Sequence, residues 1–108
     1  MSTRRIQIGE LVVESGKLMV CDPSYVNEEW MDGLGDGRDS EIDPAHAPFS
    51  YDGACAVTLS AIGGGQLFFK EGESGVGVVT RTAYGDGIYR VFLELENGQL
   101  MRLIVELN

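Results

Sequence analysis

The stretch that decides the fold is Glu14-Ser15-Gly16-Lys17-Leu18-Met19-Val20-Cys21-Asp22-Pro23-Ser24-Tyr25. Gly16 marks a tight turn, since glycine adopts the positive φ that such a turn needs. The apolar run 18–21 follows as a short strand. Pro23 ends that strand, because proline has no amide proton and restricts the residue before it. Together with the apolar residues upstream, this stretch predicts a β-hairpin from about Ile6 to Cys21.

Short apolar runs separated by glycine-containing turns continue along the rest of the chain. The runs that we expect to be strands are Ala54 to Ser60, Gln66 to Lys70, Val76 to Thr82, Ile88 to Leu95 and Leu100 to Leu107. Regularly spaced short strands with glycine turns are typical of sandwiches and barrels. We therefore predict an all-β fold, a single antiparallel β-sandwich or flattened barrel of about seven strands. It would form one domain over residues 1–108.

The last two runs allow a sharper prediction, because both are apolar at odd positions and charged residues alternate with them. A two-residue turn at Asn97-Gly98 would pair Leu93 with Arg102 and place the two apolar sets on opposite faces. A loop one residue longer pairs Leu93 with Met101 and keeps both sets on one face. We therefore predict a three-residue loop with a type I turn and Gly98 in the left-handed bulge position.

Residues 28–49 interrupt the strand pattern with a long acidic loop that contains several glycines and prolines. The residues at its start, 26–31, are expected to form one helical turn with Trp30 as an anchor on the core. Long loops without secondary structure in a compact domain are usually functional or disordered. We therefore expect a partner or ligand to bind at this loop.

Aromatic residues in and near the acidic loop are candidates for exposed contacts: Trp30, Phe49, Tyr51 and Tyr84. Such residues either anchor a loop to the core or form a binding face, since Trp and Tyr contribute much of the binding energy at interfaces. Both interpretations stay open from sequence alone. The residues that we predict to bind a partner are Trp30, Asp36, Asp39, Glu41, Phe49 and Tyr51.

The charge balance is strongly acidic, because 17 Asp and Glu against 8 Lys and Arg give a formal net charge of −9. A negative surface repels nucleic acid and anionic membranes, so we expect neither as a direct partner. No apolar run approaches the ~18 residues that a membrane helix needs, and the first residues lack the apolar stretch of a secretory signal. We therefore expect a cytoplasmic protein whose partner is a basic protein surface or a small ligand.

A cysteine-based active site is one alternative, because Cys21, Asp22 and His46 are the residue types of a nucleophile system. His46 would have to be the base, since it is the only histidine of the chain. Cys21 lies in an apolar strand, however, where a thiol reacts poorly. We therefore expect no catalytic residue and no cofactor, and we expect Cys21 and Cys55 to be buried free thiols.

A calcium site in the acidic loop is the other alternative. Hard cations prefer oxygen ligands, and the loop supplies the carboxylates of Asp32, Asp36, Asp39, Glu41 and Asp43. The glycine-aspartate pattern of residues 33–39 occurs only once, however, whereas calcium-binding repeats of this type act by stacking. The spacing also differs from that of a helix-loop-helix calcium site. We therefore predict a solvated loop without a metal.

The turn at Ser15-Gly16, the apolar strand 18–21 and the break at Asp22-Pro23 resemble a small family of bacterial proteins of unknown function. The resemblance covers about the first quarter of the chain. It implies an all-β domain and carries no known activity with it.

These observations favour a non-enzymatic binding or interaction module that uses the acidic, aromatic-flanked loop. Two alternatives belong to other classes. The first is an acidic mimic of nucleic acid that inhibits a basic nucleic-acid-binding protein, which would require carboxylates clustered on one face. The second is a small hydrolase or metal-dependent enzyme that uses Asp22, His46 and the loop carboxylates. Open edge strands would in addition allow a homodimer.

Overall fold

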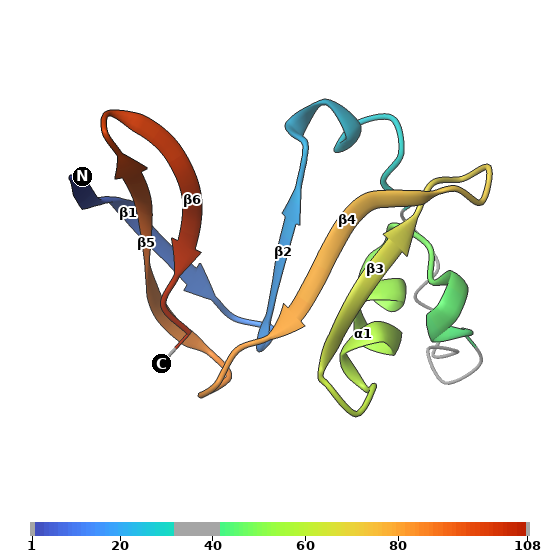
Figure 1. The fold of residues 1–108 in the computed structure, drawn as a ribbon. Helices are drawn as coiled ribbons and strands as arrows, with labels where there is room; N and C mark the ends of the chain where they lie inside the picture. The colour runs from blue at the N-terminus through green and yellow to red at the C-terminus, as the bar shows by residue number, and fades with distance from the viewer. Residues whose placement is uncertain (1, 32–41, 108) are drawn as a thin grey trace. The chain divides into compact units, whose positions relative to one another are not determined.

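The computed structural model describes residues 2–31 and 42–107, and these residues are mostly strands (Figure 1). The six strands are β1 (Thr3–Val13), β2 (Lys17–Cys21), β3 (Gly64–Phe68), β4 (Ser74–Arg81), β5 (Gly87–Glu96) and β6 (Gln99–Val105). One α-helix, α1 (Tyr51–Thr58), and the short 3₁₀ helices η1 (Pro23–Tyr25) and η3 (Pro44–His46) complete the described part. The strands form two antiparallel sheets, so the prediction of a mainly β, antiparallel fold is confirmed. The sandwich or barrel of about seven strands stays a prediction.

The chain divides into two compact units, each with its own sheet. The first unit comprises the residues up to Gly16 and those from Thr82 onward, and the second unit is Lys17–Arg81. The predicted hairpin from Ile6 to Cys21 is wrong, because β1 pairs with β5 and β2 pairs with β4. Gly16 does have the expected positive φ of 71°, but its turn leads from one sheet into the other. The long β1 finds a partner of similar length in β5, whereas β2 has only 5 residues.

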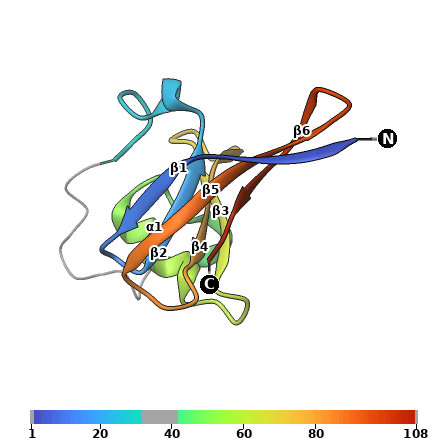
Figure 2. The same cartoon turned by 90° about the vertical axis from the view of Figure 1, so that its left-hand side faces the viewer.

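The sheet of the first unit has the order β1-β5-β6, and Figure 2 shows β5 running between the other two strands. Its register places most apolar side chains on one face, as the alternation of strands requires. The members of this apolar face are Ile6, Leu11, Val13, Tyr89, Val91, Leu93, Leu95, Leu100, Leu103 and Val105. Val13 and Tyr89 are buried, whereas Leu103 is 53% exposed.

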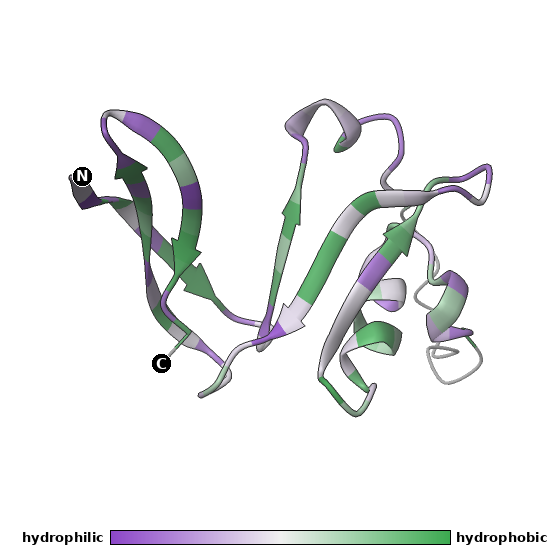
Figure 3. Ribbon diagram, in the orientation of Figure 1, coloured by the Kyte–Doolittle hydropathy of each residue, from purple (hydrophilic) through white to green (hydrophobic). Residues whose placement is uncertain are grey.

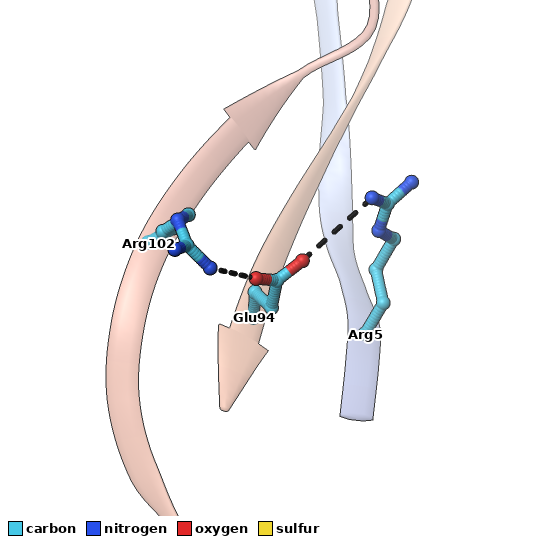
Figure 4. A network of polar contacts seen from close by, with 3 residues as sticks. All are labelled: Arg5, Glu94 and Arg102. Carbon is cyan, nitrogen blue, oxygen red and sulfur yellow. Dashed lines mark hydrogen bonds and ion pairs between the residues drawn. The ribbon is translucent and has the colours of Figure 1, made fainter. Parts of the chain in front are cut away.

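Charged side chains occupy the opposite face of the same sheet. Glu94 lies between Arg5 and Arg102 and forms an ion pair with each (Figure 4). A second pair joins Arg90 to Glu106 at 3.2 Å. Ion pairs across neighbouring strands stabilise the register, because opposite charges directly across a ladder attract. The guanidinium groups of Arg5 and Arg90 also lie 5.8 and 5.9 Å from the ring centroid of Phe92, so this face combines ion pairs with cation–π contacts.

The C-terminal hairpin corrects the predicted loop length. Glu96 pairs with Gln99, so the turn consists of Asn97-Gly98 alone. Both turn residues have positive φ, 53° and 81°, as in a type I′ turn. The predicted three-residue loop with a type I turn is therefore wrong, although the left-handed conformation of Gly98 is confirmed.

A bulge in β6 keeps the apolar residues of β5 and β6 on one face, which is the result that the longer loop was predicted to give. The register shifts between Glu94 and Leu95, so that Met101 has no partner and Leu93 pairs with Leu103. Both residues are odd-numbered, as the argument from the buried face required. The hairpin thus reaches the same face by an extra residue within β6 instead of one within the turn.

The second unit has a sheet of order β2-β4-β3 with α1 packed against β3 and β4 (Figure 1). A strand was predicted for residues 54–60, and this prediction is wrong. The Ser50 side chain caps the first turn of α1 by accepting a hydrogen bond from the Gly53 amide at 2.9 Å. A short apolar run fits a buried helix as well as a strand, and the cap at Ser50 favours the helix.

The core of the second unit lies between α1 and the sheet. Its buried members are Ala47, Phe49, Ala54, Val57, Leu67, Val76 and Val79. The predicted strands from Gln66, Val76, Ile88 and Leu100 overlap β3, β4, β5 and β6. These four strands were therefore predicted at nearly their observed positions. The helix α1, which covers the sheet of the second unit, was not predicted.

Candidate functional site

Asp22 begins the segment that leads from β2 toward the acidic loop, and it caps η1. Its carboxylate accepts hydrogen bonds from the backbone amide and the hydroxyl of Ser24, both at 2.8 Å. These hydrogen bonds, first the one from the amide, lower the pKa of Asp22 below its usual value of 3.8. The Asp-Pro break therefore combines the end of a strand with the start of a 3₁₀ turn.

Trp30 is the central residue of the candidate site. Its ring meets the ring of Phe49 edge to face, with centroids 5.0 Å apart and planes at 88°. Trp30 itself is half-buried against the core, as an anchor should be. Phe49 is 1% exposed and belongs to the core, so of the two interpretations left open for it the anchor on the core is the one that the structure bears out.

A backbone hydrogen bond closes the base of the loop beside this aromatic pair. The Met31 amide donates to the carbonyl oxygen of Phe49 at 2.9 Å. The amide of Phe68 in β3 in turn donates to the carbonyl oxygen of Ala47 at 2.8 Å. The chain on either side of residues 32–41 is therefore held together and joined to the sheet.

A second aromatic pair anchors the same segment to the end of β3. The rings of Tyr25 and Phe69 meet edge to face at 5.0 Å. Next to them, the Lys70 ammonium donates to the carbonyl oxygen of Glu28 at 2.7 Å, and the Lys70 amide donates to the Glu29 carboxylate at 3.2 Å. The segment 25–31 is therefore attached at several points and presents Trp30 on a fixed base.

The other predicted binding residues lie apart from this arrangement or outside the described residues. Tyr51 starts α1, is 54% exposed and has the Lys17 ammonium 5.7 Å from its ring centroid. The Tyr51 ring therefore makes a cation–π contact with Lys17 of β2, whereas the Trp30 ring packs on Phe49. The predicted residues Asp36, Asp39 and Glu41 lie in the segment that the structure does not describe.

Sequence reasoning missed Tyr25, Phe69 and Lys70, which hold the base of the site. One signal was available in Phe68-Phe69, because two consecutive aromatic residues in a strand point to opposite faces. Each of them therefore needs a packing partner, and in the structure Phe69 and Tyr25 both pack against the core of the second unit. Tyr25 provides this partner for Phe69.

The residues of the catalytic alternative, Cys21, Asp22 and His46, each make contacts that stabilise the fold. Asp22 caps η1, and the exposed His46 ends η3 with its ring centroid 5.3 Å from that of Phe68. Cys21 and Cys55 are free thiols as expected, but both are half-buried instead of fully buried. Within residues 2–31 and 42–107, no group of three or more His, Cys, Asp or Glu side chains is placed to hold a metal ion.

Among the described residues, no helix has the length and apolar character needed to cross a membrane. Comparisons with protein-family models, with curated proteins and with solved structures find no match to this chain. The resemblance of residues 15–23 to a bacterial family of unknown function stays a prediction.

Proposed function

We propose that the protein is a non-enzymatic binding module whose contact surface is centred on Trp30. The observation that carries this proposal is the half-buried Trp30 ring, held edge to face on the buried Phe49. An aromatic side chain fixed in this way loses little conformational entropy when a partner covers it. Tryptophan is also among the residues that contribute most to binding at interfaces.

The partner that suits this surface best is a basic protein segment. Glu28 and Glu29 precede Trp30, and residues 32–41 add Asp32, Asp36, Asp39 and Glu41 against a single arginine. Acidic residues on both sides of Trp30 in the sequence make this segment negatively charged, and negative charge attracts lysine and arginine side chains and accelerates their encounter with the protein. Trp30, Asp36, Asp39 and Glu41 would then contact the partner, with Phe49 as support and Tyr51 as a peripheral contact.

The single tryptophan of the chain makes a direct test possible. Titration with a lysine-rich peptide should shift the emission of Trp30, and an acidic peptide of equal length should not. The apparent affinity for the basic peptide should fall as salt rises, since the Debye length shrinks to about 3 Å at 1 M salt. Equal responses to the two peptides would contradict a site for basic segments.

Variants separate the roles of the anchor and the charges. With a fluorescently labelled peptide, Trp30→Ala should weaken binding by roughly tenfold or more, mainly through faster dissociation. Tyr84→Ala is the matched control, because Tyr84 is aromatic and 76% exposed. Charge reversal at Asp36, Asp39 and Glu41 should mainly slow association. Unchanged binding by Trp30→Ala would remove Trp30 from the contact surface.

The two alternatives from other classes remain predictions with less support. An acidic mimic of nucleic acid needs free carboxylates on one face, whereas Glu94 and Glu106 are paired with arginines. Asp22 and Asp43 accept hydrogen bonds as helix caps. A hydrolase or metal-dependent enzyme would use Asp22, His46 and the loop carboxylates, and detection of hydrolysis that depends on His46 would favour it over a binding module.

A further inference from the structure

The turn that joins β5 and β6 contains the sequence Asn97-Gly98, and both residues are exposed. The turn is hydrophilic, unlike much of β6 (Figure 3). Asparagine and glycine are the usual residues of such a turn, because both tolerate a positive φ. The pair also has a chemistry of its own, since the amide of a glycine can attack the side-chain amide of an asparagine that precedes it. The contacts around Asn97 decide whether the fold favours this reaction.

The Asn97 side chain is held by the N-terminal end of the same sheet. The Ser2 amide donates a hydrogen bond to Asn97 Oδ1 at 3.1 Å, and the Asn97 amide donates to the carbonyl oxygen of Ser2 at 2.8 Å. The next residue, Thr3 of β1, pairs with Glu96 of β5, so the sheet fixes Ser2 beside the turn. All of these residues belong to the first unit. The arrangement therefore lies entirely within one unit.

The Ser2 amide points at the oxygen atom that gains negative charge when the Asn97 side-chain carbonyl is attacked. A backbone amide aimed at such an oxygen stabilises the tetrahedral intermediate and accelerates acyl transfer.

The attacking group, the Gly98 amide, is accessible as well. Gly98 lies between the end of β5 and the start of β6. Within residues 2–31 and 42–107, no backbone hydrogen bond of a turn or loop has the Gly98 amide as its donor. A Cβ atom at Gly98 would meet nothing beyond its chain neighbours within 4 Å. The space for a ring between residues 97 and 98 is therefore open.

We propose that Asn97 is a site of spontaneous deamidation in the folded protein, and that the Ser2 amide assists the reaction. The Gly98 nitrogen gives its proton to water and forms a bond to Asn97 Cγ. The bond between Cγ and Nδ2 breaks, and Nδ2 takes up a proton from water and leaves as ammonia. Water then opens the resulting cyclic succinimide. Cleavage of the bond between the nitrogen and Cγ gives aspartate, and cleavage of the bond between the nitrogen and the backbone carbonyl carbon gives isoaspartate.

The modification changes both the charge and the length of the turn. Either product carries a carboxylate next to Glu96, in a chain whose formal net charge is already −9. Isoaspartate also places an additional carbon atom in the main chain, whereas Glu96 and Gln99 pair across the turn Asn97-Gly98. Tight hairpin turns require specific backbone angles. Deamidation therefore alters the geometry at the point where β5 turns into β6.

Peptide mapping of the folded full chain after incubation in mildly alkaline buffer tests the site. Asn27 is the internal control, because it is also an exposed turn residue but is followed by Glu28, whose side chain hinders attack by the amide. We expect aspartate and isoaspartate to form at position 97, and several-fold more slowly at position 27. Equal rates at the two positions of the folded protein would overturn the proposal.

Two variants at position 2 test the assistance by the Ser2 amide. Ser2→Pro removes the amide proton, whereas Ser2→Ala is the matched control that keeps it. In the folded state, Ser2→Pro should deamidate roughly threefold to tenfold more slowly than Ser2→Ala, which is the factor that one ordinary hydrogen bond supplies. In urea the contact is lost, and the two variants should react at the same rate.

Equal rates of the two variants in the folded state, or a difference that persists in urea, would refute the role of the Ser2 amide. Circular dichroism shows whether each variant is folded. If Ser2→Pro is unfolded, the comparison of Asn97 with Asn27 in the folded parent decides the proposal.

Discussion

The two units differ in how they bury apolar side chains. In the second unit a helix covers the sheet, and seven core residues are buried between them. In the first unit, by contrast, Val13 and Tyr89 are the buried hydrophobic residues among those described, and one sheet face carries ion pairs. A sheet face needs another layer to bury it. Core packing therefore contributes most to the stability of the second unit, whereas turns and strand pairing contribute more in the first unit.

The largest expected effect is the loss of the central core ring in the second unit. Phe49→Ala should destabilise the protein by about 3–5 kcal/mol, because it leaves a cavity. It should also loosen Trp30, whose ring packs on Phe49. Urea unfolding measures the first effect and Trp30 emission the second. Tyr84→Ala, in the first unit and 76% exposed, should leave stability nearly unchanged, and equal losses would refute the contrast.

A pair of glycine substitutions sharpens the same contrast. A Cβ atom at Gly53 in α1 would lie 1.9 Å from the carbonyl oxygen of Pro48, whereas one at Gly9 in β1 meets nothing within 4 Å. Gly53→Ala should therefore destabilise by about 1–3 kcal/mol through overpacking, although alanine normally favours a helix. Gly9→Ala should be tolerated. Thermal unfolding compares the two, and a stabilised Gly53→Ala variant would show that the chain relaxes easily there.

The turn of the C-terminal hairpin tests how far the first unit depends on local geometry. Gly98 has a φ of 81°, which β-branched residues resist. Gly98→Val should destabilise by about 1–2 kcal/mol, while Gly98→Asn should lose less because asparagine tolerates this region. A melting temperature of Gly98→Val equal to that of the parent would mean that the turn can adopt another conformation.

The smallest effect on folding is expected from the acidic loop. Replacement of residues 32–41 by a short Gly/Ser linker should leave the protein folded, since the cost of loop closure changes slowly with length. The replacement should stop before Ile42, which packs on the core, and Asp43, which caps η3. Near-ultraviolet circular dichroism should keep its signal, and its collapse would show that the loop belongs to the core.

Within the candidate site, sequence reasoning identified the anchor and missed its support. Trp30 was expected to pack on the core, and it does so. For Phe49 both a core anchor and a surface contact stayed open, and it is buried, while Tyr25 and Phe69 form a second anchor that was not foreseen. Whether an aromatic residue is buried depends on what the rest of the chain places beside it, and a single sequence does not contain that information directly.

The sequence by itself determined the local features of this protein. It located the turns at Gly16 and Gly98 and the break at Asp22-Pro23, because positive φ and a missing amide proton are properties of single residues. The alternation of apolar residues also determined that Leu93 pairs with an odd-numbered residue of β6. Only the tertiary structure decided that β1 pairs with β5, that residues 51–58 form a helix and that Met101 forms the bulge. These choices depend on contacts between residues far apart in the chain, whose energies local sequence patterns do not specify.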